Sequence, residues 1–368
     1  MSFQFSQDQL DAVDSICDEL VNSVPIEKHA IAVLTGSAGT GKTTVVREII
    51  NKINVDWPLT TIELCATTHR AATVLENIAG APVTTGHALF KLRPSVTKYG
   101  KEVLTNAGIC EIPYGSVVII DESSMIGNQF LKAIVDIVKE RALKLLFVGD
   151  PFQLPPPTDI CSIFDGSLYT FKLTTVHRQS GGNPVLEKAN EFREYIEGIR
   201  NTEPTLETNI NSKGEGIHVL PHSEFVTKFV EKYIDYSAGA EVDIPLCTYT
   251  NESAINYNSM VRKAAYFLED TMEPFYPGER LIANSVVLHG DKTILTNNEI
   301  VYVDSYVEAE SYDIPGYIVT IQGEYNKYQK SNIKSVFSPR TKAAAEKILK
   351  EEKALAVKSK SKTGWQAY

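Results

Sequence analysis

The chain has 368 residues, of which 43% are hydrophobic and 22% charged, with a formal net charge of −10. These values are ordinary for a folded protein of about two domains. No apolar run approaches the roughly 20 residues that span a bilayer, and the acidic balance argues against binding polyanions over the whole surface. The N-terminus lacks the pattern of a secretion signal, and the five scattered cysteines form no CxxC pair. We therefore expect a cytoplasmic protein with reduced core cysteines.

Helix and strand patterns alternate through the first half of the chain. Between Gln7 and Val21, apolar residues recur at helical spacing and predict an amphipathic helix. Short apolar runs predict buried strands at 30–34, 61–67, 116–120 and 143–148, with helices after Lys42 and over 69–78. Alternating strands and helices predict an α/β fold, with a parallel sheet covered on both faces.

The stretch TGSAGTGKTT contains the pattern GxxxxGK[ST] between the first expected strand and its helix. Such glycines let backbone N–H groups surround phosphates, while Lys42 reaches the β- and γ-phosphates and the Thr43 hydroxyl binds Mg²⁺. A glycine-rich turn arising by chance is the alternative, and the flanking strand and helix argue against it. We expect nucleotide contacts from Gly36, Ser37, Ala38, Gly39, Thr40, Gly41, Lys42, Thr43 and Thr44.

The segment VVIIDESSM ends another expected strand in two acidic residues. Asp121 is placed to hold Mg²⁺ through its water shell, and Glu122 to orient and deprotonate the attacking water. The alternative is that DESS only caps a helix.

The segment GDPFQLPPP follows the strand at 143–148 and reaches the same edge of the sheet, where open α/β sheets bind ligands. Gln153 could therefore touch the γ-phosphate or the attacking water. The alternative is a loop stiffened by prolines.

The pattern changes in two places. Residues 90–115 predict a short inserted hairpin around the Tyr99-Gly100 turn. After a polar stretch at 196–216, α/β elements resume with strands at 217–220 and 244–249 and a helix at 224–234, followed by a small all-β segment from 274 to 334. Residues 325–368 hold 11 Lys and Arg against 3 Asp and Glu, which indicates either a nucleic-acid-binding tail or a solvated helix.

Six segments occur in a fixed order: LTGSAGTGKTT, CATTHRAA, TTGHALFKL, IIDESSM, GDPFQLPP and LTTVHRQ. This set resembles the superfamily 1 DNA helicases of the B (RecD-like) branch over nearly the whole chain. The resemblance implies ATP bound between two RecA-like domains, single-stranded DNA across them, and 5′-to-3′ movement. We expect a RecA-like ATP-binding domain at 1–172, a second, incomplete RecA-like domain at 173–272, and a small β-barrel insert with a basic helix at 273–368.

The resemblance also assigns roles to single residues. Gln9 corresponds to an adenine-reading glutamine, although Ser6 and Gln9 also form a capping-box pattern. Arg178 corresponds to an arginine finger that reaches the γ-phosphate, or is a surface arginine at a helix start. The hairpin at 93–110 resembles a duplex-splitting pin, in which Thr105 falls near the place of a tip aromatic and leaves Tyr99 nearby.

Six residues correspond to DNA-facing positions, where hydroxyls and helix N-termini suit phosphate contacts. Each has an ordinary alternative: a lone histidine is usually a surface or core residue, and TNES also reads as a helix start. The expected DNA contacts are Thr68, His69, Thr85, His87, Thr250 and Asn251.

The sequence thus predicts an ATP- and Mg²⁺-dependent 5′-to-3′ DNA helicase that acts on single-stranded and fork DNA. Two segments that follow the β-insert in the family are not found, so we expect this chain to need a C-terminal helicase fragment for full activity. The alternative is an ATP- and DNA-binding module that does not translocate; a P-loop ATPase unrelated to DNA is disfavoured. Replication proteins are possible partners, the setting would be the host cytoplasm if the origin is a phage, and the choice between replication and recombination stays open.

Overall fold

The computed structural model describes residues 5–96, 102–156, 159–175, 183–237, 245–266, 273–283, 287–289, 292–295, 299–311, 314–323, 331–337 and 347. The chain divides into two compact units. The first comprises residues 1–180, 280–302 and 308–368, and the second comprises residues 181–279 and 303–307. The domain boundaries expected from the sequence stay a prediction.

A six-stranded sheet forms the centre of the first unit, with the order β3-β2-β6-β7-β1-β8. Every printed pairing in it is parallel, so the expected α/β fold is confirmed. The four strands expected in the first half are present, and two are added at the edges. The strands are β1 (Ala30–Gly36), β2 (Ile62–Ala66), β3 (Thr84–Thr85), β6 (Val117–Asp121), β7 (Lys144–Gly149) and β8 (Tyr169–Leu173).

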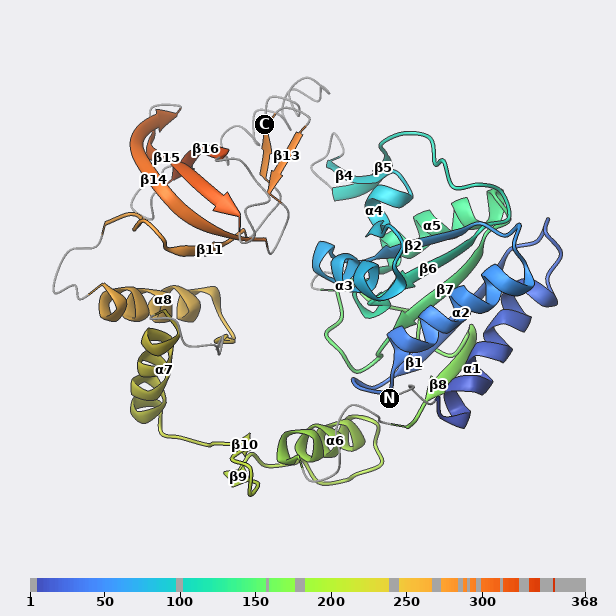
Figure 1. The fold of residues 1–368 in the computed structure, drawn as a ribbon, viewed down its shortest axis with the longest axis horizontal. Coiled ribbons are helices and arrows are strands. Elements are labelled where there is room, and N and C mark those ends of the chain that lie inside the picture. Colours follow the sequence, from blue (N-terminus) through green and yellow to red (C-terminus); the bar gives the residue numbers. More distant parts are fainter. Residues whose placement is uncertain are drawn as a thin grey trace. The chain divides into compact units, whose positions relative to one another are not determined.

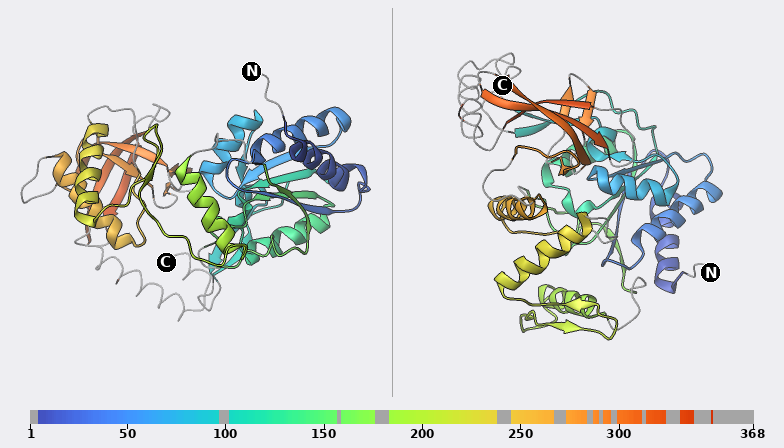
Figure 2. Two further views of the ribbon diagram at one scale, coloured as in Figure 1. Left: turned by 90° about the horizontal axis from the view of Figure 1, so that it is seen from below. Right: turned by 60° about the vertical axis from the view of Figure 1, so that its left-hand side comes forward.

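Helices cover both faces of this sheet (Figures 1 and 2). Strand β6 shows why: Val117 and Ile119 belong to one apolar core cluster, while Val118 and Ile120 belong to the other. Successive side chains of a strand point to opposite faces, so an apolar run needs cover on both. The first cluster lies under α1 (Gln7–Cys17), α2 (Lys42–Asp56) and α3 (His69–Ala79), and the second under α4 (Gly86–Leu89) and α5 (Asn128–Glu140).

The expected hairpin is present as β4 (Leu92–Val96) and β5 (Glu102–Asn106). Thr105 pairs with Arg93, one position from the base of the hairpin. The expectation that Thr105 lies near the tip is therefore wrong, because the two strands run three pairs further before the turn. The turn itself, with Tyr99, lies outside the described residues.

The second unit contains α6 (Pro184–Ile196), α7 (His222–Ser237), α8 (Asn251–Ala265) and a two-strand hairpin of β9 (Asn209–Ile210) and β10 (Gly216–Ile217). The strand expected at 217–220 is reduced to Ile217, and described residues 245–249 form no strand. Within the part of this unit that the structure describes, these two segments have no parallel strand beside them with which to form backbone hydrogen bonds. Cys247, expected in a core, is exposed, whereas Cys17 and Cys65 are buried.

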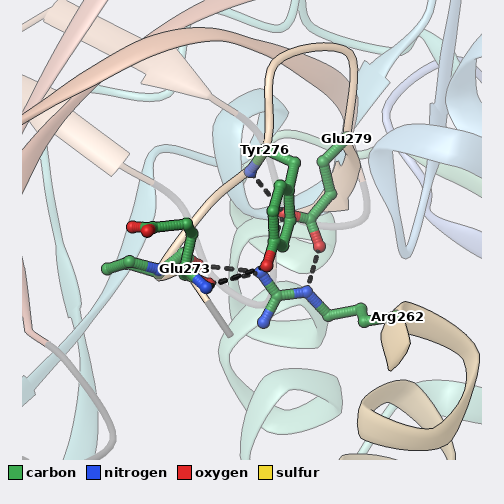
Figure 3. Close-up of polar contacts among 5 residues, drawn as sticks. Arg262, Glu273, Tyr276 and Glu279 are labelled. Carbon is green, nitrogen blue, oxygen red and sulfur yellow. Dashed lines mark hydrogen bonds and ion pairs between the residues drawn. The ribbon is translucent and has the colours of Figure 1, made fainter. Parts of the chain in front are cut away.

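A polar cluster joins the end of α8 to the segment that follows it in the second unit (Figure 3). The Arg262 guanidinium forms an ion pair with Glu279 at 2.6 Å and donates to the carbonyls of Glu273 and Pro274. Its guanidinium carbon lies 5.3 Å from the ring centre of Tyr276. Arg262 thus fixes three neighbouring chain positions with its planar set of donors.

The β-rich segment expected after residue 274 is confirmed. A four-stranded sheet has the order β11-β14-β15-β16, and β12 pairs with β13. These strands are β11 (Arg280–Ile282), β12 (Val287–His289), β13 (Lys292–Leu295), β14 (Ile300–Ser311), β15 (Ile314–Gly323) and β16 (Ser331–Phe337). The basic tail lies outside the described residues except for Lys347. Among the described helices, none is long and apolar enough to cross a membrane.

Candidate nucleotide and nucleic-acid site

The P-loop connects β1 to α2 at the carboxyl edge of the sheet. Gly41 has a φ of 81°, and a Cβ there would meet the side-chain nitrogen of Gln9. Only glycine fits, because the left-handed conformation and the close neighbour both exclude a side chain. The loop therefore presents its backbone to a ligand at the N-terminus of a 15-residue helix, where the helix dipole favours an anion.

Two side chains hold this loop from within. Lys42 Nζ donates to the carbonyls of Gly36 at 2.9 Å and Ser37 at 3.3 Å. Gln9 is fully buried; its Nε2 donates to the Thr40 carbonyl at 3.0 Å, and its Oε1 accepts from the Ser6 backbone N–H at 3.1 Å. The capping-box interpretation is therefore confirmed, and the adenine contact stays a prediction.

The acidic pair lies at the end of β6, separated from β1 by β7. Burial raises the pKa of Asp121 to about 6; the Glu122 N–H that it accepts at 2.9 Å and the charge of Lys42 act in the opposite direction. Glu122 has left-handed backbone angles (φ 54°, ψ 41°), and its carbonyl accepts from Thr67 Oγ1 at 3.2 Å. The helix-start alternative holds in part: Glu122 occupies the N-cap position of a short 3-10 helix, Ser123–Met125, but makes no side-chain capping bond. A non-glycine residue held in this conformation is typical of functional sites.

Sequence reasoning missed three residues that position this edge. Ser123 is buried, and its hydroxyl donates to the Ile120 carbonyl while accepting from the Val148 N–H, which joins the ends of β6 and β7. Asp150 is 1% exposed and accepts from the Phe152 N–H. The signal was a small polar residue within two positions of the end of each buried strand. Gln153 itself is exposed at this edge, where its predicted role stays open.

Asp8, on the first turn of α1, is the third. Its carboxylate accepts from the backbone N–H groups of Thr174 and Thr175, at 3.2 and 3.1 Å, just beyond β8. Partial burial raises its pKa, but hydrogen bonds from Ser6, Thr175 and Thr174 outweigh it and lower the pKa to about 2. Arg178 follows three residues later and lies outside the described residues, so the arginine finger stays a prediction.

Three of the predicted DNA contacts are threonines that cap helices. Thr68 begins α3, Thr85 begins α4 and Thr250 begins α8, and each hydroxyl oxygen accepts a backbone N–H from inside its helix. The helix-start interpretation of TNES is thus confirmed. A capping hydroxyl uses its oxygen and retains its hydrogen, so a further bond to a phosphate is chemically compatible with the cap.

The other predicted contacts are two histidines and an asparagine. His69 and Asn251 are exposed at the first positions of α3 and α8. The His87 ring lies 4.5 Å from the ring of Phe130, tilted by 36°, and burial lowers the pKa of the imidazole. A neutral ring beside an aromatic one suits stacking better than ion pairing. The structure leaves these DNA contacts as predictions.

The donor set fits a hard divalent cation. No group of three or more His, Cys, Asp or Glu side chains gathers as a metal site among the described residues. The Thr43 hydroxyl and the Asp121 carboxylate are oxygen ligands of the kind that Mg²⁺ takes when phosphates and water complete its shell. A cation here would also offset the cost of keeping the half-buried Asp121 carboxylate charged.

Comparison with known proteins agrees with this geometry. The AAA_30 family profile, described as an AAA domain, matches residues 5–219. The ATP-dependent RecD2 DNA helicase of Deinococcus radiodurans is 30% identical over 181 residues, covering 48% of this chain and 22% of that protein. The ATP-dependent DNA helicase dda of Enterobacteria phage T4 is 24% identical over 272 residues, covering 72% of this chain and 58% of that protein.

Among solved structures, the Pif1 helicase from Candida albicans aligns with 90% of this chain and 78% of its own, at 14% identity and a TM-score of 0.40. The chain thus spans less than two thirds of the length of the two curated relatives. The matched profile covers more than half of the chain and includes the P-loop, the acidic pair and the residues around them. Two of the relatives to which the chain is similar are DNA helicases, and the chain itself belongs to the AAA_30 family of AAA domains.

Proposed function

We propose that this chain hydrolyses ATP with Mg²⁺ when single-stranded DNA is bound, and that it uses this cycle to move 5′ to 3′ and unwind fork DNA. The observation that carries the proposal is the junction of the P-loop with the acidic pair at one edge of the sheet. There the positive charge of Lys42 lies close enough to the half-buried Asp121 to favour the ionised form of its carboxylate. Family membership supports the same chemistry.

Each residue has a definite task in this proposal. The P-loop amides and Lys42 bind the phosphates, while Thr43 and Asp121 hold Mg²⁺, which would neutralise charge on the β- and γ-phosphates. Glu122 orients the attacking water and accepts its proton, with its backbone held by Thr67. Gln153 contacts the γ-phosphate or the water. Arg178 supplies positive charge to the transition state, an effect worth roughly 10³–10⁵ in rate.

Phosphate release tests the hydrolytic part of the proposal. We expect single-stranded DNA to stimulate turnover strongly in the wild type, and Lys42→Ala to lower turnover by about 100-fold or more. The matched control is Lys52→Ala on the same helix, which removes a surface ion pair with Asp14 and Asp56 and should leave turnover unchanged. Equal turnover by the Lys42 and Lys52 variants would remove the P-loop from the mechanism.

Unwinding requires a separate measurement, because a chain that hydrolyses ATP on DNA need not separate strands. A forked duplex with a 5′ single strand, labelled on one strand, should release that strand only with ATP and only from the wild type. DNA-stimulated turnover without strand release would favour the non-translocating module instead. In that case, restoration of release by an added C-terminal helicase fragment would support an enzyme made of two chains.

A further inference from the structure

The first unit contains a cavity of about 290 Å³ beside the catalytic edge, on the side away from the P-loop helix. It lies where the end of β2, helix α4, hairpin strand β5 and the start of α5 meet. Ile120 of β6 and Asp159 complete its lining, so segments far apart in the sequence build it. Ligand pockets in proteins start at roughly 300 Å³, so this one suits a single ring system better than a whole nucleotide.

Apolar and aromatic side chains form its walls. Leu104 comes from the hairpin, Ile120 from β6, and Phe130 from α5. The Phe130 ring meets Phe90 edge to face, with ring centres 6.4 Å apart, and the His87 ring lies 4.5 Å from it at a tilt of 36°. A flat heterocycle could lie against these rings without rearranging the core, because stacking is tolerant of base identity.

Polar groups reach the same cavity from the start of α5 and from the segment that follows β7. The Asp159 carboxylate accepts from the backbone N–H groups of Gln129 and Ile160, at 3.0 and 2.8 Å, and these bonds lower its pKa. Asp159 thus stays an acceptor in a fixed position. The Gln129 side chain is exposed at the rim and carries both a donor and an acceptor. A carboxylate and a carboxamide together match the mixed donors and acceptors on the edge of a nucleobase.

The cavity adjoins a surface suited to a phosphate backbone. Thr67, in its lining, directly precedes Thr68, the cap of the 11-residue helix α3, whose exposed first residues are His69 and Arg70. A strand whose phosphates lie along this helix start would carry its bases past the cavity mouth. Phosphate contacts fix the position of a strand, while a pocket can engage one base.

We propose that this cavity receives one nucleobase of the bound single strand, which stacks on Phe130 and His87 and meets Gln129 and Asp159 with its edge. The inference rests on the proposed function and adds a specific base subsite to it. Occupancy would also press on Thr67, whose hydroxyl holds the Glu122 carbonyl at 3.2 Å. The subsite therefore offers a direct route by which bound DNA positions the residue that activates water.

The test uses the full chain and a duplex with a 5′ single-stranded overhang, so that the junction fixes the binding register. One abasic site is moved along the overhang, and affinity is measured by fluorescence anisotropy with a non-hydrolysable ATP analogue. We expect one or two positions at which base removal weakens binding roughly 5- to 100-fold, the range of stacking on an aromatic side chain. A flat profile would overturn the inference.

Two variants locate that base in the cavity. Gln129→Trp fills the cavity. This variant should bind every substrate as weakly as the wild type binds DNA that lacks the base at the sensitive position, and its affinity should not depend on where the abasic site lies. Gln129→Ala truncates an exposed side chain and keeps the fold intact. It should weaken binding of intact DNA about 5-fold. It should barely change binding of the substrate whose missing base would occupy the cavity, because the effects of removing two groups that contact each other do not add.

The control is Leu59→Trp, which adds the same ring at a 99% exposed position outside the cavity and should keep the wild-type profile. Retained position dependence in Gln129→Trp would show that the base lies elsewhere. Absence of any single-strand binding and of DNA-stimulated turnover in the wild type would instead contradict the proposed function itself. DNA stimulation with a flat abasic profile would overturn only the base subsite.

Discussion

Different interactions stabilise the interior of each of the two units of this chain. In the first, apolar side chains cover both faces of a parallel sheet, and the strands β6 and β7 are almost completely buried. In the second, Val261 is the one apolar side chain, prolines aside, that is less than a tenth exposed on the described helices. There the ion pair and carbonyl contacts of Arg262 link α8 to the following segment.

The difference follows from what each unit offers its helices. An amphipathic helix gains stability by placing its apolar stripe on another apolar surface, and a buried sheet supplies one for α2 and α5. Helices α7 and α8 meet mainly through rings such as Phe225 and Tyr257, which lie 6.4 Å apart edge to face. The groups proposed to act in hydrolysis stand on the unit with the buried core, as precise positioning of phosphate and water requires.

The largest stability effect is expected from the core of the first unit. Ile134 on α5 is fully buried beneath the sheet, so Ile134→Ala should lower the free energy of unfolding of this unit by about 2–5 kcal/mol. Urea unfolding followed by Trp57 fluorescence, with Trp365→Phe as background, measures this unit, because Trp57 contacts its other core cluster. The matched Val261→Ala should leave the Trp57 transition in place; an equal shift would mean that the two units unfold as one.

A smaller effect is expected when the polar cluster of the second unit is broken. Arg262→Ala leaves the Glu279 carboxylate, 12% exposed, without its ion pair, and should destabilise the link at α8 by about 2 kcal/mol. Amide hydrogen exchange of α8 should then be roughly 30-fold faster. Val261→Ala, one residue earlier, should accelerate exchange only about 5-fold. The reverse order would show that apolar packing dominates here as well.

Much of the first unit could be predicted because its signals are local. The strand runs, the P-loop pattern and the acidic pair after a buried strand each specify their structure within about ten residues. The hairpin at 92–106 was also predictable, but the register that places Thr105 near its base was not, because register depends on the turn and on cross-strand packing.

Two contacts that no local signal reveals act across the chain. Thr67 holds the carbonyl of Glu122, and Asp8 holds backbone that lies more than 160 positions away. Nothing in the sequence near Asp8 distinguishes it from the neighbouring Asp11 on the same helix. The strand expected at 244–249 failed for a related reason, because an apolar run becomes a strand only where a neighbouring strand completes its hydrogen bonds.

The smallest predicted effect tests whether such a distant contact contributes to the rigidity of the first unit. Asp8→Asn keeps an oxygen acceptor for Thr174 and Thr175 but removes its charge. Because the folded state lowers the pKa of Asp8 from 3.8 to about 2, its stabilisation is present above pH 3.8 and is lost as the pH falls through 2. After allowance for solvent screening, we expect a loss of about 1 kcal/mol at pH 7.

Urea midpoints at pH 7, 5, 3.5 and 2.5, read by Trp57 fluorescence, measure this difference for Asp8→Asn and for the control Asp11→Asn. The Asp8 variant should be less stable than the wild type at the two higher pH values and approach it at the lowest. A deficit that is independent of pH would assign the effect to altered geometry and not to charge. A deficit of the same size in the Asp11 variant would mean that the charge of the helix start, and not the link to the end of β8, stabilises the unit.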